Sequence, residues 1–164
     1  MRTRILAPVL APLLIAACGE PTAPRPLGRF VLTSLGGQPE PFVWFDHTFS
    51  SGERRVFSIV ADTLWLHADG RLQRSDAHMS QSFPPDGGPP LVNVSASSTG
   101  GSHRREGDRV IVERVVLFPS PGTTQVDTLL FRDGALEQTK RMGLVCSPEP
   151  CPPPRDFLLR YERR

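Results

Sequence analysis

The sequence has no apolar run long enough to cross a lipid bilayer as a helix. Its N-terminal apolar run, residues 5–17, holds thirteen residues, two of them prolines, whereas about 20 apolar residues are needed to span the hydrocarbon core. Charge of one sign is not in excess either, because 19 basic side chains stand against 17 acidic ones. No basic stripe interleaved with aromatic residues is present to follow a phosphate backbone, so we expect no nucleic-acid partner.

Sequence motifs that carry catalysis are also missing. The chain has no Gly-x-Ser-x-Gly, Ser-x-x-Lys or His-Glu-x-x-His, the patterns that place a nucleophile or a catalytic zinc ion. None of the four histidines, His47, His67, His78 and His103, stands at metal-ligand spacing. Asp76 and His78 would share one face of a strand near His67, but solvent-facing polar residues are the simpler interpretation. We therefore expect no enzyme, no metal site and no cofactor.

The first 17 residues are typical of a bacterial export signal. A start with two arginines precedes the apolar run, which ends in Ile15-Ala16-Ala17-Cys18. This ending resembles the lipobox of bacterial lipoproteins, in which small residues fit the peptidase cleft and the cysteine thiol is alkylated by a diacylglycerol. Two or three acyl chains would give stable anchoring where one is marginal. The resemblance implies cleavage of residues 1–17 and a lipid on Cys18; the alternative is an ordinary secretory signal with an incidental cysteine.

Cleavage before Cys18 would leave a neutral chain with a tether. The two arginines of the signal would be lost, so that 17 basic side chains would face 17 acidic ones. Residues 18–27 hold three prolines and no periodic apolar pattern, which indicates a stiff, solvated tether. Gly19 stands where enterobacterial lipoproteins of the inner membrane carry an aspartate. We therefore expect a cell-envelope protein at the outer membrane, on its periplasmic face, rather than at the inner membrane.

From residue 28 onward, apolar and polar residues alternate in short runs separated by turn residues. The 18 prolines and 14 glycines cluster between these runs, and no window of a dozen residues favours an amphipathic helix. Runs that favour strands lie at residues 30–32, 42–45, 56–60, 62–67, 71–74, 91–94, 109–118, 126–131, 135–139 and 157–162, and from them we expect eight or nine strands. The stretches 80–90 and 95–107 are expected to be mobile loops.

One sequence pattern occurs twice. Residues 62–66 (Asp-Thr-Leu-Trp-Leu) recur as residues 127–131 (Asp-Thr-Leu-Leu-Phe), and Asp-Gly follows each copy. The first copy predicts a three-residue hairpin loop with Gly70 in the left-handed region, and the second a two-residue type I′ loop, Asp133-Gly134. Successive hairpins indicate a meander that closes into an up-and-down barrel. We expect an all-β fold: a single small antiparallel barrel of eight to nine strands over residues 28–164.

Three sequence motifs of the domain carry a resemblance to a known group of proteins. Residues 28–39 read Gly-x-Phe-x-Leu-x-Ser-x-x-Gly-Gln-Pro, residues 64–70 read Leu-x-Leu-x-x-Asp-Gly, and residues 159–164 are rich in arginine with one aromatic residue. In these motifs the chain resembles the uncharacterised lipocalin-like lipoproteins of environmental bacteria. The motifs consist of turn and core residues, so the resemblance implies a fold rather than a ligand.

Two cysteines remain once Cys18 carries lipid. Cys146 and Cys151 flank Ser-Pro-Glu-Pro, and export would place them where disulfides persist. A bridge would close a six-residue loop and pin a Pro-rich turn before the last strand, which the chain-entropy model values at roughly 2 kcal/mol. Redox and metal roles stay open as alternatives, although the spacing is not Cys-x-x-Cys and a metal would need further ligands.

Two functions follow as hypotheses. The first is a non-enzymatic, membrane-anchored barrel that binds a small apolar ligand, which requires an interior cavity of about 300 Å³ or more. The alternative is a structural or interaction protein of the envelope, with a filled barrel that recognises protein or cell wall through its loops or a sheet edge. Arg104 and Arg105, expected at a loop tip, would touch lipid headgroups or an anionic partner, or simply be solvated.

Overall fold

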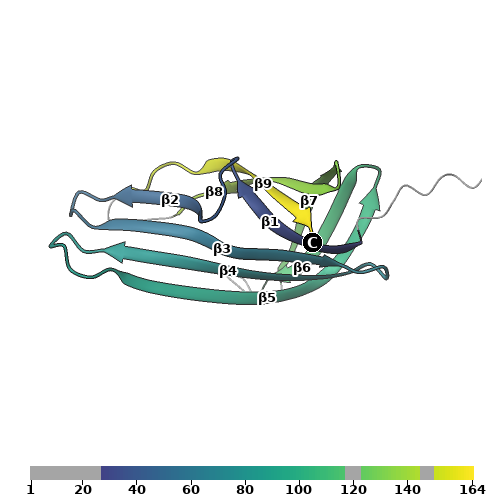
Figure 1. Cartoon of the computed structure of the whole chain (residues 1–164), viewed down its shortest axis with the longest axis horizontal. Coiled ribbons are helices and arrows are strands. Elements are labelled where there is room, and N and C mark those ends of the chain that lie inside the picture. The colour runs from purple at the N-terminus through teal and green to yellow at the C-terminus, as the bar shows by residue number, and fades with distance from the viewer. Residues whose placement is uncertain (1–26, 117–122, 145–149) are drawn as a thin grey trace, which may run out of the picture.

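The computed structural model describes residues 27–116, 123–144 and 150–164, which form nine strands and no helix (Figure 1). The strands are β1 (Gly28–Leu35), β2 (Phe42–Thr48), β3 (Arg54–Leu66), β4 (Arg71–Phe83), β5 (Leu91–Glu106), β6 (Arg109–Val116), β7 (Thr123–Arg132), β8 (Ala135–Met142) and β9 (Arg155–Arg163). Within the described ranges, no helix is long and apolar enough to cross a membrane.

The strands form a closed antiparallel barrel. Their order is β1-β9-β8-β7-β6-β5-β4-β3, and the sheet closes because β1 also pairs with the end of β3. β2 is a ninth strand that pairs with the first half of β3. The predicted all-β class and the up-and-down meander of eight to nine strands are therefore confirmed.

Both predicted hairpin loops are present. Leu66 pairs with Leu72 across the first loop, where Gly70 has a φ of 84°. Across the second loop, Asp133 and Gly134 have φ values of 49° and 78°, as a type I′ turn requires at both central residues. Local sequence therefore determined these two turns.

One predicted loop is instead almost entirely strand, and the other begins as strand but is a loop from residue 84 to residue 90. β4 continues to Phe83, and β5 runs through most of the stretch 95–107 that was expected to be mobile. Twelve consecutive residue pairs join β4 and β5 without a register shift, from Arg71 with Ser102 to Ser82 with Leu91. Serine and glycine have little strand preference of their own, but pairing with a neighbouring strand overrides it.

The molecule has two distinct ends (Figure 1). At one end, which we call the tether end, the domain begins and the short hairpin turns lie; it comprises residues 28–29, 67–71, 103–109, 132–134 and 162–164. At the other end a four-stranded sheet extends beyond the barrel; this arm comprises residues 42–48, 54–59, 78–83 and 91–95. β3, β4 and β5 are long enough to belong to both.

The apolar core fills the barrel between its two ends. Phe30 is fully buried and meets the ring of Phe131 edge-on, with the ring centroids 6.4 Å apart. Burial of each such side chain stabilises the fold by roughly 1.5–3 kcal/mol. The buried cluster consists of Phe30, Leu32, Leu35, Phe42, Ile59, Leu64, Leu66, Leu72, Val110, Val112, Leu129, Leu136, Leu159 and Tyr161.

Candidate functional site

A buried ion pair lies inside the barrel, next to Tyr161 of the apolar core. The Arg74 guanidinium binds both carboxylate oxygens of Asp62, at 2.9 Å and 2.5 Å, and the Tyr161 hydroxyl donates to Asp62 at 2.8 Å. The Asp62 side chain is fully buried, so these partners replace the water it would otherwise bind. Burial, together with the nearby Asp62 charge, raises the pKa of Tyr161 well above its ordinary value.

A second group of polar side chains occupies the remaining interior. Arg114 reaches Asp127 at 3.2 Å, and the Gln138 amide donates to Asp127 at 3.0 Å. The cavity that these three side chains line together with Arg74 and Tyr161 measures about 10 Å³, whereas small-molecule sites measure at least about 300 Å³. This part of the interior therefore has no room for the apolar ligand of the first hypothesis, and it favours the filled barrel of the alternative.

Near the arm, β5 has an unpaired edge. Its pairing with β6 extends only from Glu106 with Arg109 to Gly101 with Arg114, whereas its pairing with β4 continues to Leu91. Residues 91–100 are thus paired on one side only within the described part of the chain. Among the described residues nothing pairs with their backbone N–H and C=O groups on the other side, and such groups can bind an added strand.

Gly101 marks the point where β6 leaves β5. A Cβ atom at this position would overlap the carbonyl oxygen of Glu113 and lie 3.0 Å from the Cα atom of Arg114. Only glycine permits this close approach of the two backbones. Beyond it, the Arg114–Asp127 pair keeps β6 with the barrel, and β5 continues into the arm.

The unpaired edge of β5 lacks the features that usually protect edge strands. Residues 91–98 are all exposed, and Leu91, Val92 and Val94 have exposed fractions of 76%, 53% and 60%. The stretch 91–102 contains no charged residue and no proline. Charges, prolines and bulges normally prevent such edges from pairing with other chains, so this edge is suited to strand addition.

The opposite edge of the arm, β2, is protected. A register shift between Val43 and Phe45 interrupts its pairing with β3, and the Asp46 carboxylate binds Arg54 through two bonds of 2.6 Å and 2.7 Å. Bulges and charges of this kind discourage edge-to-edge association. The two edges of one sheet therefore differ in their capacity to bind another strand.

A second gap in the barrel is bridged by side chains. β7 pairs with β8 only from Leu130 to Arg132, so the two strands separate towards the arm. Gln138 of β8 crosses this gap to Asp127 of β7, and the charge of Asp127 protects the β7 edge as charges do elsewhere. The β5 edge has no comparable bridge among the described residues.

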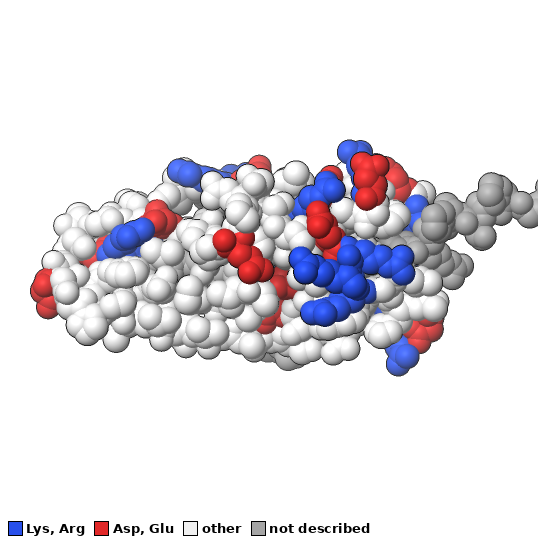
Figure 2. Space-filling model, viewed as in Figure 1, with Lys and Arg blue, Asp and Glu red and all other residues white. Residues whose placement is uncertain are grey.

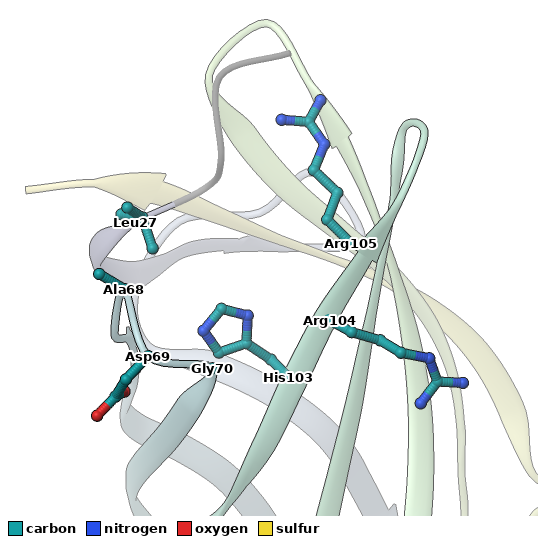
Figure 3. Close-up of a pocket in the computed structure, with 7 residues that line it drawn as sticks. All are labelled: Leu27, Ala68, Asp69, Gly70, His103, Arg104 and Arg105. Carbon is teal, nitrogen blue, oxygen red and sulfur yellow. The ribbon is translucent and has the colours of Figure 1, made fainter. Parts of the chain in front are cut away.

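A pocket of about 380 Å³ opens at the tether end (Figure 3). Leu27 and the β3–β4 turn form one side of it, and residues 103–105 of β5 form the other. The His103 Nε2 atom lies 2.9 Å from the carbonyl oxygen of His67, and Arg105 Nε donates to Gly107 at 2.6 Å. The second ring nitrogen of His103 and Nη1 of Arg105 are buried and have no hydrogen-bond partner among the residues that the structure describes.

The two covalent modifications predicted from the sequence involve residues that the structure does not describe. Ile15, Ala16, Ala17 and Cys18 precede residue 27, and Cys146 falls in the gap 145–149. Cys151 is half-buried just before β9. Lipidation of Cys18 and the Cys146–Cys151 disulfide therefore stay predictions.

The histidines do not converge. His78 Nε2 lies 2.9 Å from Asp76, as the shared strand face predicts. The expectation that His67 lies nearby is wrong, because His67 closes the turn at the tether end while His78 pairs with Ile59 in the arm. Within the described ranges, no three His, Cys, Asp or Glu side chains gather as a metal site.

No family model, curated protein or solved structure matches the chain. Its candidate site is therefore defined by geometry, and that site is the open edge of β5. Sequence reasoning missed the edge because its serines and glycines indicated a loop. The usable signal was the twelve-residue stretch 91–102 without charge or proline.

Proposed function

We propose that this chain is a non-enzymatic, lipid-anchored protein of the bacterial cell envelope. In this proposal, its filled barrel presents the open edge of β5 to an extended segment of another envelope protein. The proposal of an anchor depends on the lipobox at Cys18. The observation that carries the proposed interaction is the one-sided pairing of residues 91–100 in a strand without charge.

Backbone hydrogen bonds would supply most of the contact. The N–H and C=O groups of an antiparallel strand point to its two sides in alternate pairs of residues, so about five of the residues 91–100 face the open side. An added strand would bind these groups as a peptide does in β-strand addition. Because β4 already holds β5 straight over twelve residue pairs, the edge is ordered before its partner arrives.

The side chains of the edge define the chemistry of the partner. Val92 and Val94 point to one face of the sheet and Leu91 to the other, since successive strand residues alternate. A partner segment of low charge with apolar or β-branched residues at alternate positions would cover them. The arm lies at the end opposite the start of β1 (Figure 1), so this surface would face away from the anchoring membrane, for which we propose the outer membrane.

In-cell photo-crosslinking tests the proposed edge. A photoreactive residue at Asn93 should give adducts with an envelope protein, in a segment that is extended and poor in charge. Val94→Lys should lower the adduct yield at least about tenfold, because an edge lysine opposes strand addition. The matched control is Leu158→Lys, since Leu158 is 46% exposed but lies in β9, which is paired on both sides. Equal yields from both variants, or adducts only with a second copy of this chain, would refute the proposed partner.

The anchor is tested independently of the edge. Cells supplied with a labelled fatty acid should incorporate the label into the chain, and Cys18→Ala should abolish this incorporation. A chain that carries no label, or a Cys18→Ala variant that still carries it, would contradict the lipid anchor.

A further inference from the structure

The tether end has a charge that the arm does not share. Eight arginines lie there against five acidic residues, whereas the arm and its loops, residues 42–59 and 78–95, hold two arginines against three acidic residues. Figure 2 shows basic side chains gathered towards the end where the domain begins. The residues of the tether end are Arg29, Arg71, Arg104, Arg105, Arg109, Arg132, Arg163 and Arg164, with Asp69, Glu106, Asp108, Asp133 and Glu162.

Most of these arginines are not neutralised by ion pairs. Arg71 binds Asp69, and Arg104 binds Glu106 and Glu113. The other six have no ion-pair partner in the part of the chain that the structure describes, and all of them except Arg105 are exposed: Arg29, Arg105, Arg109, Arg132, Arg163 and Arg164. Even with Asp108, Asp133 and Glu162 nearby, arginines outnumber acidic residues at this end, and such an excess of positive charge attracts anions from solution or from a surface.

The chain before the barrel limits how far this end can lie from a membrane. Leu27, which lines the pocket, is nine residues from Cys18. A fully extended chain spans at most about 3.3–3.6 Å per residue, so the tether end lies within roughly 30 Å of a lipid on Cys18. The arm, at the far end of the strands, has no such constraint.

The pocket of the tether end offers an anion one unused donor, and a second one when the His103 ring is protonated. Arg105 Nη1 and the second ring nitrogen of His103 are buried and unpartnered there. An unsatisfied buried polar atom in a native structure calls for a missing partner such as a water or an ion. Arg guanidinium and the charged form of an imidazole both donate to phosphate oxygens.

We propose that the tether end is a lipid-docking face that seats on anionic phosphate headgroups of the membrane to which the tether leads. The exposed arginines contact headgroups around the rim, and the pocket beside His103 and Arg105 takes the phosphate of one lipid. This inference rests on the proposed anchor at Cys18 and is independent of the proposed partner at β5. It orients the molecule end-on, with the open edge of β5 held away from the lipid.

The two tryptophans of the chain provide a direct test. Trp65 borders the tether end, since it pairs with Arg29 and its ring is 5.8 Å from the Arg29 guanidinium, and Trp44 lies in the arm. Trp44→Phe and Trp65→Phe each leave one reporter. The lipidated full chain of each variant is placed in vesicles with a headgroup quencher, either of neutral phosphatidylcholine or with about 30% phosphatidylglycerol, a share that gives a negative surface potential.

On the anionic vesicles, quenching of Trp65 should rise at least about twofold over the neutral vesicles. High salt should reverse the rise, because the Debye length falls to about 3 Å at 1 M. Quenching of Trp44 should be the same on both. Equal quenching of Trp65 on both vesicles overturns the docking face, whereas failure of the chain to float with neutral vesicles instead overturns the anchor.

A matched pair of charge variants locates the face. In the first variant, serine replaces four arginines of the tether end: Arg109, Arg132, Arg163 and Arg164. The rise in Trp65 quenching on anionic vesicles, which we call the anionic increment, should then disappear. Replacing four exposed arginines outside the tether end by serine should preserve it; these are Arg54, Arg55, Arg141 and Arg155. Retention of the increment in the first variant, or equal loss in both, overturns the assignment, provided that circular dichroism shows each variant folded.

Discussion

The two parts of β5 belong to one strand but have different surroundings. Residues 101–106 all pair with β6, residues 101 and 102 also pair with β4, and the stretch carries Arg104, Arg105 and Glu106. Residues 91–100 pair with β4 alone and carry no charge. The difference shows that closure of the barrel uses only part of its longest strand. The rest is left as an ordered, uncharged edge, which we propose as the binding surface.

The interior of the barrel also bears on where the protein can bind a partner. Asp62, Arg74, Arg114 and Asp127 form ion pairs that occupy the interior just where the arm starts. The interior beside these pairs has a cavity of only about 10 Å³, which is why our proposal places recognition on the outside of the barrel. The following predictions test this division between a closed barrel and an open arm.

The largest expected effect is loss of the buried ion pair. Asp62→Asn leaves Arg74 buried without its counter-charge and should lower the free energy of unfolding by about 3–5 kcal/mol. The same change at Asp46, whose pair with Arg54 is solvent-exposed in the arm, should cost at most about 1 kcal/mol. Urea unfolding of both variants measures the difference. Equal losses would mean that the arm depends on its ion pair as strongly as the barrel depends on its own, and would contradict the prediction.

Two adjacent glycines test the branch between barrel and arm. Gly101→Ala places a Cβ against the backbone of Glu113 and Arg114 and should cost about 3 kcal/mol, because backbone atoms cannot move aside as a flexible side chain can. At Gly100 the nearest atom, the Leu72 carbonyl oxygen, is 4.0 Å away, so Gly100→Ala should change stability by less than about 1 kcal/mol. Thermal unfolding of the pair checks the prediction; a harmless Gly101→Ala would refute the close approach of the strands.

Alkaline pH should weaken the barrel through Tyr161. Burial and the Asp62 charge raise the pKa of Tyr161 in the folded state, whereas the unfolded residue loses its proton near pH 10. The folded state therefore holds the extra proton, and stability should fall by about 1.4 kcal/mol for each pH unit above about 10. The chain has one tyrosine, so phenolate absorbance reports this group alone. Ionisation near pH 10 in the folded protein would contradict the buried hydrogen bond.

The smallest expected effect lies on the open edge. Val94→Lys should change the free energy of unfolding by no more than about 0.5 kcal/mol, because its side chain is 60% exposed and leaves no cavity. Val110→Lys, at a fully buried position of β6, should instead prevent folding. Chemical unfolding of both measures the contrast. A strongly destabilised Val94→Lys variant would mean that the edge is covered.

Sequence patterns predicted the features that depend on neighbouring residues. The turns at Gly70 and Asp133-Gly134 follow from local conformational preference, and the repeated hairpins indicated the meander. The pairing of Asp62 with Arg74 and with Tyr161, 99 residues away, depends on how the barrel closes, and no local pattern encodes it. The strand at residues 95–100 was missed for the same reason, because only its register with β4 makes it a strand.

Residue-resolved amide hydrogen exchange along β5 of the isolated protein tests the central claim most directly. The account predicts continuous protection over residues 101–103, whose backbone is bound on both sides. Over residues 91–100 it predicts an alternating pattern, in which amides facing β4 exchange at least about a hundredfold more slowly than amides facing the open side. Continuous protection across residues 91–100 in the monomer would show that this edge is already occupied and would contradict the account.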